Sequence, residues 1–93
     1  MGAGDPWPAY VSVPAGSSVA FQPAAGVTVL VLYIINTNTT YIGFYYTDGT
    51  TDTYIEKLGS GQYRFTMINT KYLKAVNTGA AAYSAGVYGM CLS

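Results

Sequence analysis

The stretch Val27–Ile35 constrains what this chain can fold into more than any other segment. It reads V-T-V-L-V-L-Y-I-I, so eight of its nine residues are apolar and five of those eight are β-branched. Nine residues is long for a strand but short for a buried helix, and β-branched side chains favour strands. Gly26 before the run and Asn36 after it favour the same assignment. We therefore predict a long β-strand here.

Both faces of this predicted strand are apolar. Successive side chains of a strand point to opposite faces of its sheet. Strict alternation gives one face to Val27, Val29, Val31, Tyr33 and Ile35, and the other face to Thr28, Leu30, Leu32 and Ile34. One face can pack on the core of the chain itself. The second face then needs cover from more of the same chain or from a second subunit.

The rest of the chain consists of short strand-like runs separated by turns rich in Gly, Pro, Asn and Ser. With the central run, the expected strands are 9–13, 18–21, 27–35, 40–46, 51–58, 62–68, 71–76 and 80–92. No segment has a helical period. This spacing is typical of an all-β protein, a single small antiparallel β-sandwich of about eight short strands. The sequence leaves a jelly-roll and an immunoglobulin-like topology open.

The sandwich domain is expected over residues 9–93, and residues 1–8, which contain two Gly and two Pro, are expected to form an N-terminal arm. The strongest turn signal is Asp48-Gly49. It predicts a type I′ hairpin, because both central residues of that turn need a positive φ. Gly43, in the strand before it, indicates a bulge or a close approach by another backbone.

Charge is scarce, because only 9% of the residues are charged, against about 25% in typical soluble domains. The net charge is zero, so no basic surface favours nucleic acid or an anionic membrane. No apolar run approaches the ~18 residues of a spanning helix, and the first eight residues lack the pattern of a secretory signal. We expect no nucleic-acid and no membrane partner. The surface should be rich in hydroxyl groups, covered by neighbouring subunits, or both.

Catalytic chemistry has little support in the residues. There is no histidine, which removes the usual general base and the commonest metal ligand. Asp52 and Glu56 share a strand face at a separation of about 13 Å. That is beyond the about 5–9.5 Å of paired glycosidase carboxylates. We therefore predict a protein that is not an enzyme, with no catalytic, cofactor-binding or metal site.

Cys91 is the only cysteine, so no disulfide can form within the chain. Its plain interpretation is a small buried apolar group, and its alternative is a bridge between two chains. Trp7 stands between two prolines. It either packs on its own domain or anchors in a neighbouring subunit, since Trp is favoured at the centre of interfaces.

Ten tyrosines give the chain many groups with an apolar ring and a polar tip, which suit cores, subunit interfaces and sugar-binding surfaces. Together with the central run, they lead us to predict an interface made by Trp7, Val27, Val29, Val31, Tyr33, Tyr41, Tyr45 and Tyr54. The alternative is a glycan- or receptor-binding module, as in a fibre tip or adhesin. Its platform would be Tyr41, Tyr45, Tyr46, Tyr54 and Tyr63.

Three segments carry a resemblance to a class of proteins: V-P-A-G-S-S at 13–18, Y-Y-T-D-G-T at 45–50 and N-T-K-Y-L-K-A-V-N-T-G at 69–79. In these patterns the chain resembles small β-sandwich structural proteins of viruses, meaning the capsid decoration (cement), turret and fibre-type proteins of tailed phages and archaeal viruses. The resemblance implies a non-catalytic role in the virion, after synthesis in the host cytoplasm. It implies a homo-oligomer, for instance a trimer, bound to a major capsid or other virion protein.

Overall fold

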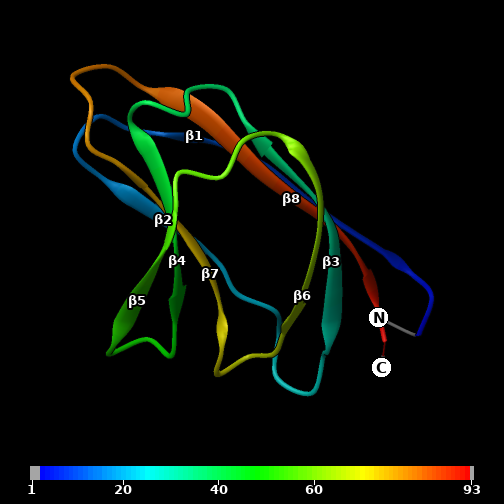
Figure 1. Cartoon of the computed structure of the whole chain (residues 1–93). Helices are drawn as coiled ribbons and strands as arrows, with labels where there is room; N and C mark the ends of the chain where they lie inside the picture. Colours follow the sequence, from blue (N-terminus) through cyan, green and yellow to red (C-terminus); the bar gives the residue numbers. More distant parts are fainter. Residues whose placement is uncertain (1–2, 93) are drawn as a thin grey trace.

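The computed structural model describes residues 3–92 and contains eight strands and no helix in that range (Figure 1). The strands are β1 Pro6–Val13, β2 Ser18–Phe21, β3 Val29–Asn36, β4 Ile42–Thr47, β5 Asp52–Glu56, β6 Gly61–Met67, β7 Tyr72–Asn77 and β8 Tyr83–Cys91. The prediction of an all-β chain with eight short strands is confirmed. Each strand lies within three residues of a predicted one at either end.

The strands form two four-stranded antiparallel sheets. Sheet A has the order β1-β8-β3-β6 and sheet B the order β2-β7-β4-β5. Each strand of the first half pairs with its counterpart in the second half: β1 with β8, β2 with β7, β3 with β6 and β4 with β5. This is the pairing of one long hairpin wound over itself, the jelly-roll arrangement of two Greek keys. The immunoglobulin-like alternative is therefore excluded.

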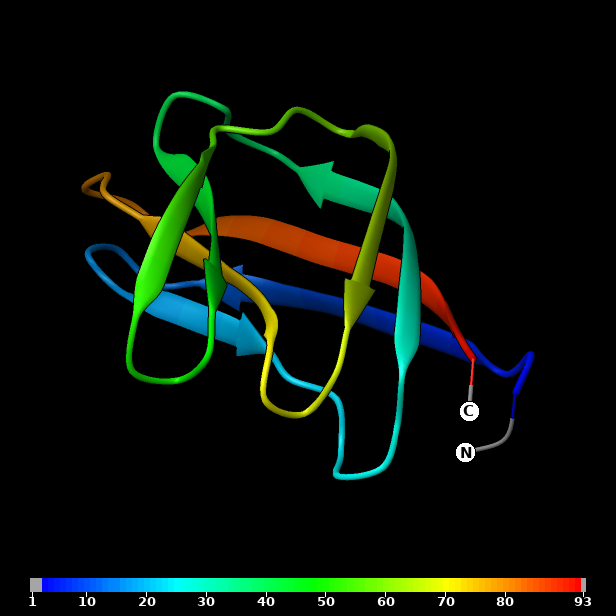
Figure 2. The same cartoon turned by 60° about the horizontal axis from the view of Figure 1, so that its bottom comes forward.

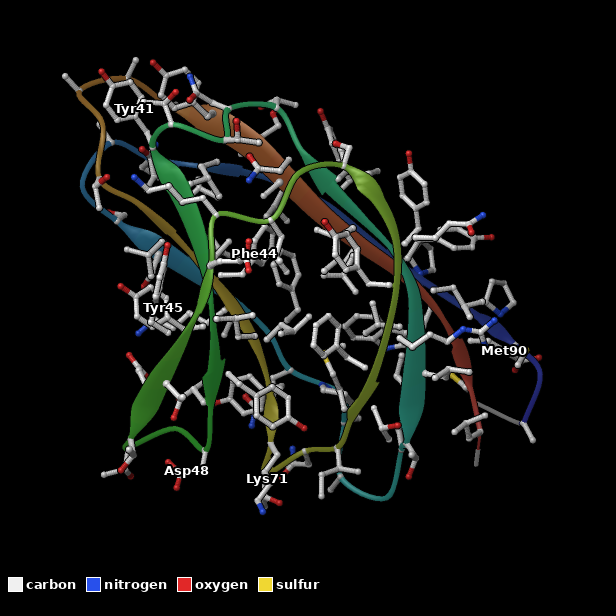
Figure 3. The ribbon with its side chains drawn as sticks, viewed as in Figure 1. Tyr41, Phe44, Tyr45, Asp48, Lys71 and Met90 are labelled. Carbon is white, nitrogen blue, oxygen red and sulfur yellow. The ribbon has the colours of Figure 1, made fainter. Side chains whose placement is uncertain are left out.

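The core lies between the two sheets. Sheet A contributes alternate residues such as Val13, Val31 and Val87, and sheet B contributes Phe44 and Leu73, all of them at most 1% exposed. Phe44 points into the space between the sheets (Figure 3). Burying one such side chain stabilises the fold by about 1.5–3 kcal/mol. Cys91 is also fully buried, as its plain interpretation predicts.

β3 does not alternate strictly. Its register shifts between Val31 and Tyr33 against both neighbouring strands. The buried residues of β3 are therefore Val29, Val31, Ile34 and Asn36, while Leu30, Leu32 and Ile35 are half-buried and Tyr33 is exposed. The predicted face that joined Tyr33 and Ile35 to Val29 and Val31 is wrong beyond Val31, because a bulge reverses the faces of the residues that follow it.

The predicted N-terminal arm is also corrected. β1 begins at Pro6, three residues earlier than expected, and pairs with β8 from Pro6 opposite Met90. Before it, the Gly4 N–H donates to the carbonyl of Cys91 at 2.7 Å. Figure 2 shows that β1 begins and β8 ends at the same end of the sandwich. Met1 and Gly2, the first residues of the expected arm, lie outside the described residues.

The Asp48-Gly49 hairpin joins β4 to β5 as predicted, but the turn type differs. Thr47 pairs with Asp52, so the loop has the four residues between them. Gly49 has a φ of 94°, whereas no residue other than glycine has a positive φ in the described chain. The predicted type I′ turn is therefore wrong, and the longer loop places only the glycine in the left-handed region.

Candidate interaction surface

The outer face of sheet A, which we call the apolar face, exposes several large apolar side chains. Its apolar side chains are Tyr10 of β1, Tyr88 and Met90 of β8, and Leu30, Leu32, Tyr33 and Ile35 of β3. The registers align them in rows, with Tyr33 beside Tyr88 and Leu30 beside Met90. Tyr10, Tyr33 and Tyr88 are 61%, 39% and 48% exposed.

Sheet A contains a single charged residue, Arg64 of β6. The β6 residues alternate between inward and outward positions, which puts Arg64 on the apolar face with Gln62 and Thr66. A shallow depression beside the bulge is lined by Leu32, Gln62, Tyr63 and Arg64. The apolar face therefore has aromatic and aliphatic side chains over β3 and its neighbours, and polar side chains with one cation over β6.

Gly86 shapes the centre of the apolar face. Its neighbours across the strands are Tyr10 and Ile35. A Cβ atom at this position would lie 2.8 Å from the carbonyl oxygen of Ala9 and 3.0 Å from the ring of Tyr10. The missing side chain thus lets the Tyr10 ring lie close to the backbone of β8, with most of the ring still exposed.

The outer face of sheet B, which we call the polar face, has a different chemistry. Lys74 of β7 and Asp52 of β5 form an ion pair with a nitrogen–oxygen distance of 2.7 Å. The hydrogen bond from Lys74, and a second from Thr47, hold the pKa of Asp52 below its usual value. Beside them Tyr45 and Tyr54 meet edge to face, with ring centres 5.2 Å apart.

The polar face is suited to contact with water, because it carries the Asp52–Lys74 ion pair. Tyr45 and Met90, one from each outer face, lie at opposite sides of the molecule in Figure 3. The two sheets therefore present surfaces of opposite character.

The eight residues predicted for the interface do not lie on one surface. Val29 and Val31 are fully buried in the core, and Trp7 and Val27 are half-buried and pack against it. These four contribute to the fold of the chain itself. Trp7, Val29 and Val31 take inward positions of their strands, and Val27 packs on the core just before β3. Trp7 thus packs on its own domain, the first of its two interpretations.

Of the other four, only Tyr33 lies on the apolar face. Tyr41 lies at the end of the sandwich remote from the β1 start, stacked on Tyr83 at 5.8 Å (Figure 3). Tyr45 and Tyr54 lie on the polar face. The five tyrosines of the alternative glycan platform are likewise divided, because Tyr63 is half-buried and packs against the core.

Tyr46 does not belong to a glycan-binding surface either. It is half-buried, and its hydroxyl donates to the carbonyl of Thr66 on β6 at 2.7 Å. Burial raises the pKa of this hydroxyl. The Tyr46 side chain therefore bridges the two sheets instead of presenting its ring to a ligand.

Most residues of the apolar face were missed at the sequence level. Leu30 and Leu32 belonged to a face that the alternation marked as apolar, so the existence of a second apolar surface was predictable. Tyr10, Tyr88 and Met90 come from the two ends of the chain, and only the jelly-roll pairing brings them beside β3. The signal that could have found Tyr10 is its alternation with Pro8 and Ser12 as outward positions of a first strand.

The acidic side chains of the described residues do not form a cluster that could hold a metal ion. Among residues 3–92 no group of three or more cysteine, aspartate and glutamate side chains could hold a metal ion. Asp48 lies at the hairpin tip (Figure 3), where its carboxylate accepts hydrogen bonds from the Thr51 and Thr50 N–H groups at 2.7 and 2.9 Å. These two bonds lower the pKa of Asp48. Its role in the structure is to close the turn.

The chain was compared with known protein families and with curated proteins. A search against models of known protein families finds no match, and a search of curated proteins finds none either. In the part of the chain that the structure describes, no helix has the length and hydrophobicity to cross a membrane.

Proposed function

We propose that this chain is a non-catalytic structural protein of a virion, a capsid decoration (cement) protein or another surface subunit. It acts by protein–protein assembly as a homo-oligomer and binds a major capsid or other virion protein. The apolar face is the surface that it uses. In this proposal the protein is made in the host cytoplasm and ends in the particle.

The observation that carries the proposal is the difference between the two outer faces. The apolar face exposes Tyr10, Tyr33 and Tyr88 beside aliphatic side chains, with Arg64 as its single charge. The polar face has the same sheet geometry but holds an ion pair. Contiguous exposed apolar patches are rare on monomeric soluble proteins and mark interaction sites, and tyrosine is enriched in such sites. The chain thus offers one face to a partner and one to water.

The jelly-roll topology is compatible with this proposal but also with other functions. The same arrangement occurs in viral capsid proteins, lectins and cupins. One fold can support many functions. We therefore infer assembly from the apolar face and from the resemblance of the sequence to small β-sandwich structural proteins of viruses.

Particle binding tests the proposal. Particles purified from a culture that produces this protein should carry it through a density gradient, and gold-labelled antibodies against it should decorate their surface. A protein that stays at the top of the gradient, with unlabelled particles beside it, would contradict the proposal.

A pair of variants tests the face. Tyr33→Glu places a carboxylate at the centre of the apolar face and should weaken particle binding roughly thirtyfold, the equivalent of about 2 kcal/mol. Tyr45→Glu makes the same change on the polar face and should leave binding within about twofold. Equal effects of both variants would argue against the apolar face as the binding surface.

A glycan-binding module remains the second candidate, and one observation favours it. Tyr54 is 51% exposed and lies beside Tyr45 and the Asp52–Lys74 ion pair, so aromatic and charged groups adjoin on the polar face. A glycan array separates the two candidates. Binding that is lost in Tyr54→Ala, with no particle binding, would favour the glycan module.

A further inference from the structure

The free edges of the two sheets differ in how they are protected. A sheet edge exposes unpaired backbone N–H and C=O groups, and natural proteins block it with proline, charge or shortness. β1 carries Pro6 and Pro8, which have no N–H to offer. β2 has only four residues. β5 has five, begins with Asp52 and ends with Glu56. Three of the four edges are therefore blocked.

β6 is the exception. It has seven residues, no proline, and Arg64 as its one charge. Its inward side chains, Tyr63, Phe65 and Met67, are half-buried or buried, so the strand is held firmly in sheet A while its far edge has no neighbouring strand.

The backbone groups on this edge can be identified. The carbonyl of Thr66 points away from β3, since it accepts the Tyr46 hydroxyl from sheet B. In an antiparallel strand both backbone groups of a residue point to one side, and successive residues alternate. The register against β3 shifts between Phe65 and Gln62, but the inward and outward positions of β6 alternate through the shift without a break. We therefore infer that Gln62 and Arg64 present their N–H and C=O groups to the same open side as Thr66. The Tyr46 hydroxyl covers the Thr66 end, which leaves the first half of β6 for a partner.

We propose that β6 pairs antiparallel with β6 of a second copy, joining two sheets A into one eight-stranded sheet. A twofold axis at Tyr63 places Gln62 opposite Arg64 of the second copy, so the two like charges avoid facing each other. It also leaves the Tyr46–Thr66 hydrogen bond intact. Such a contact is isologous and closes at two chains.

Pairing at β6 would also enlarge the apolar surface that one assembled unit presents. Four strands of eight residues cover about 19 by 26 Å, or about 500 Å², from the usual strand spacing and rise. A stable interface buries about 800 Å² on each partner. Two faces joined at β6 double the flat area of one face to about 1,000 Å². The role of this dimer in particle binding rests on the proposed function, but the pairing itself does not.

The molar mass in solution tests the pairing. Light scattering on the eluting protein should give twice 9.9 kDa for the unchanged chain. Arg64→Pro removes an N–H from the open edge and should give 9.9 kDa. The matched control is Ser12→Pro on β1, an edge that already carries two prolines, and it should remain a dimer. A monomer at millimolar concentration, a trimer, or a dimer that survives Arg64→Pro would overturn the inference.

Hydrogen exchange supplies a second test that does not depend on a variant that folds. Exchange of the Gln62 and Arg64 amides in the unchanged chain should slow at least tenfold as the protein concentration rises through the association range. Exchange at Tyr10 on the blocked β1 edge should not change. No difference between the two edges would overturn the pairing.

Particle binding separates this inference from the proposed function. Tyr33→Glu should remain a dimer while binding the particle roughly thirtyfold more weakly. Arg64→Pro should become a monomer that binds the particle at least tenfold more weakly. An Arg64→Pro monomer that binds as well as the unchanged chain would leave the proposed function standing and refute the role given to the dimer.

Discussion

Two buried asparagines hold the loops at one end of the sandwich. Asn77 is 1% exposed and donates its amide to the carbonyls of Val13 and Ala81, at 3.0 and 2.7 Å. Asn36 donates in the same way to Ile42 and Leu58. Each side chain thus satisfies carbonyls from strands and loops that the sequence places far apart. Unsatisfied, those carbonyls would be costly inside the protein.

Replacing Asn77 with alanine should destabilise the fold. The change leaves buried carbonyls without a donor and the Gly79 N–H without its side-chain acceptor. We expect a loss of about 2–4 kcal/mol in the free energy of unfolding. Urea denaturation measures it. Asn69→Ala, which removes one hydrogen bond to Pro23, is the control and should cost about 1 kcal/mol. Equal losses would show that burial of the hydrogen bonds is unimportant here.

Asp48 makes stability depend on pH at the acidic end. Hydrogen bonds from Thr51 and Thr50 lower its pKa in the folded chain. Between the lowered and the ordinary pKa the unfolded state binds more protons, so stability rises with pH and is lost as pH falls through the folded pKa. The relevant window lies below about pH 4. Asp48→Asn keeps the acceptor oxygen and should flatten the fall of the melting temperature in this window. An unchanged slope would contradict the role given to Asp48.

Among the elements, β3 best separates what sequence could predict from what it could not. The run of β-branched residues was enough to predict a long central strand, and the turn residues were enough to place the other seven. The bulge was not predictable, because Leu32 is as apolar as its neighbours and nothing in the composition marks an extra residue. The order of strands in the sheets was also hidden, since several sandwich topologies share the same strand spacing.

Gly89 of β8 lies close against the backbone of β3. A Cβ atom at Gly89 would lie 2.6 Å from the carbonyl oxygen of Leu30 and 2.8 Å from a methyl group of Val29. Gly89→Ala should therefore push β8 away from β3 and cost about 1–3 kcal/mol of unfolding free energy. Gly59→Ala, whose Cβ would make only an ordinary contact with Thr39, should stay within about 0.5 kcal/mol. Chemical denaturation of both variants measures the two losses of unfolding free energy, and equal losses would contradict the prediction.

The whole molecule is a β-sandwich whose two outer faces, the apolar face and the polar face, differ in chemistry. Its neutral, charge-poor composition predicted a surface rich in hydroxyl groups, covered by neighbouring subunits, or both, but composition could not say where on the surface. The candidate interface was predictable only as an apolar second face of the central strand. Tyr10, Tyr88 and Met90 join that face because the first and last strands pair beside β3, a long-range contact that no local pattern records.

A contact through the apolar face should respond little to salt. Arg64 is the only charged residue of sheet A, so electrostatic attraction should contribute little to binding through the apolar face. We expect particle binding to change less than about twofold between roughly 0.05 and 0.5 M sodium chloride, and to strengthen in sulfate, which favours apolar burial. A steep loss of binding in sodium chloride would point to the polar face instead. Titration of labelled protein onto particles gives the answer.

The most direct measurement is an electron cryomicroscopy reconstruction of the particle that contains this protein. We predict density for the jelly roll on the particle, with Leu32, Tyr33 and Ile35 against another protein chain and the Asp52–Lys74 side in solvent. A reconstruction in which the outer surface of sheet A faces open water, with the opposite sheet against the particle, would contradict it.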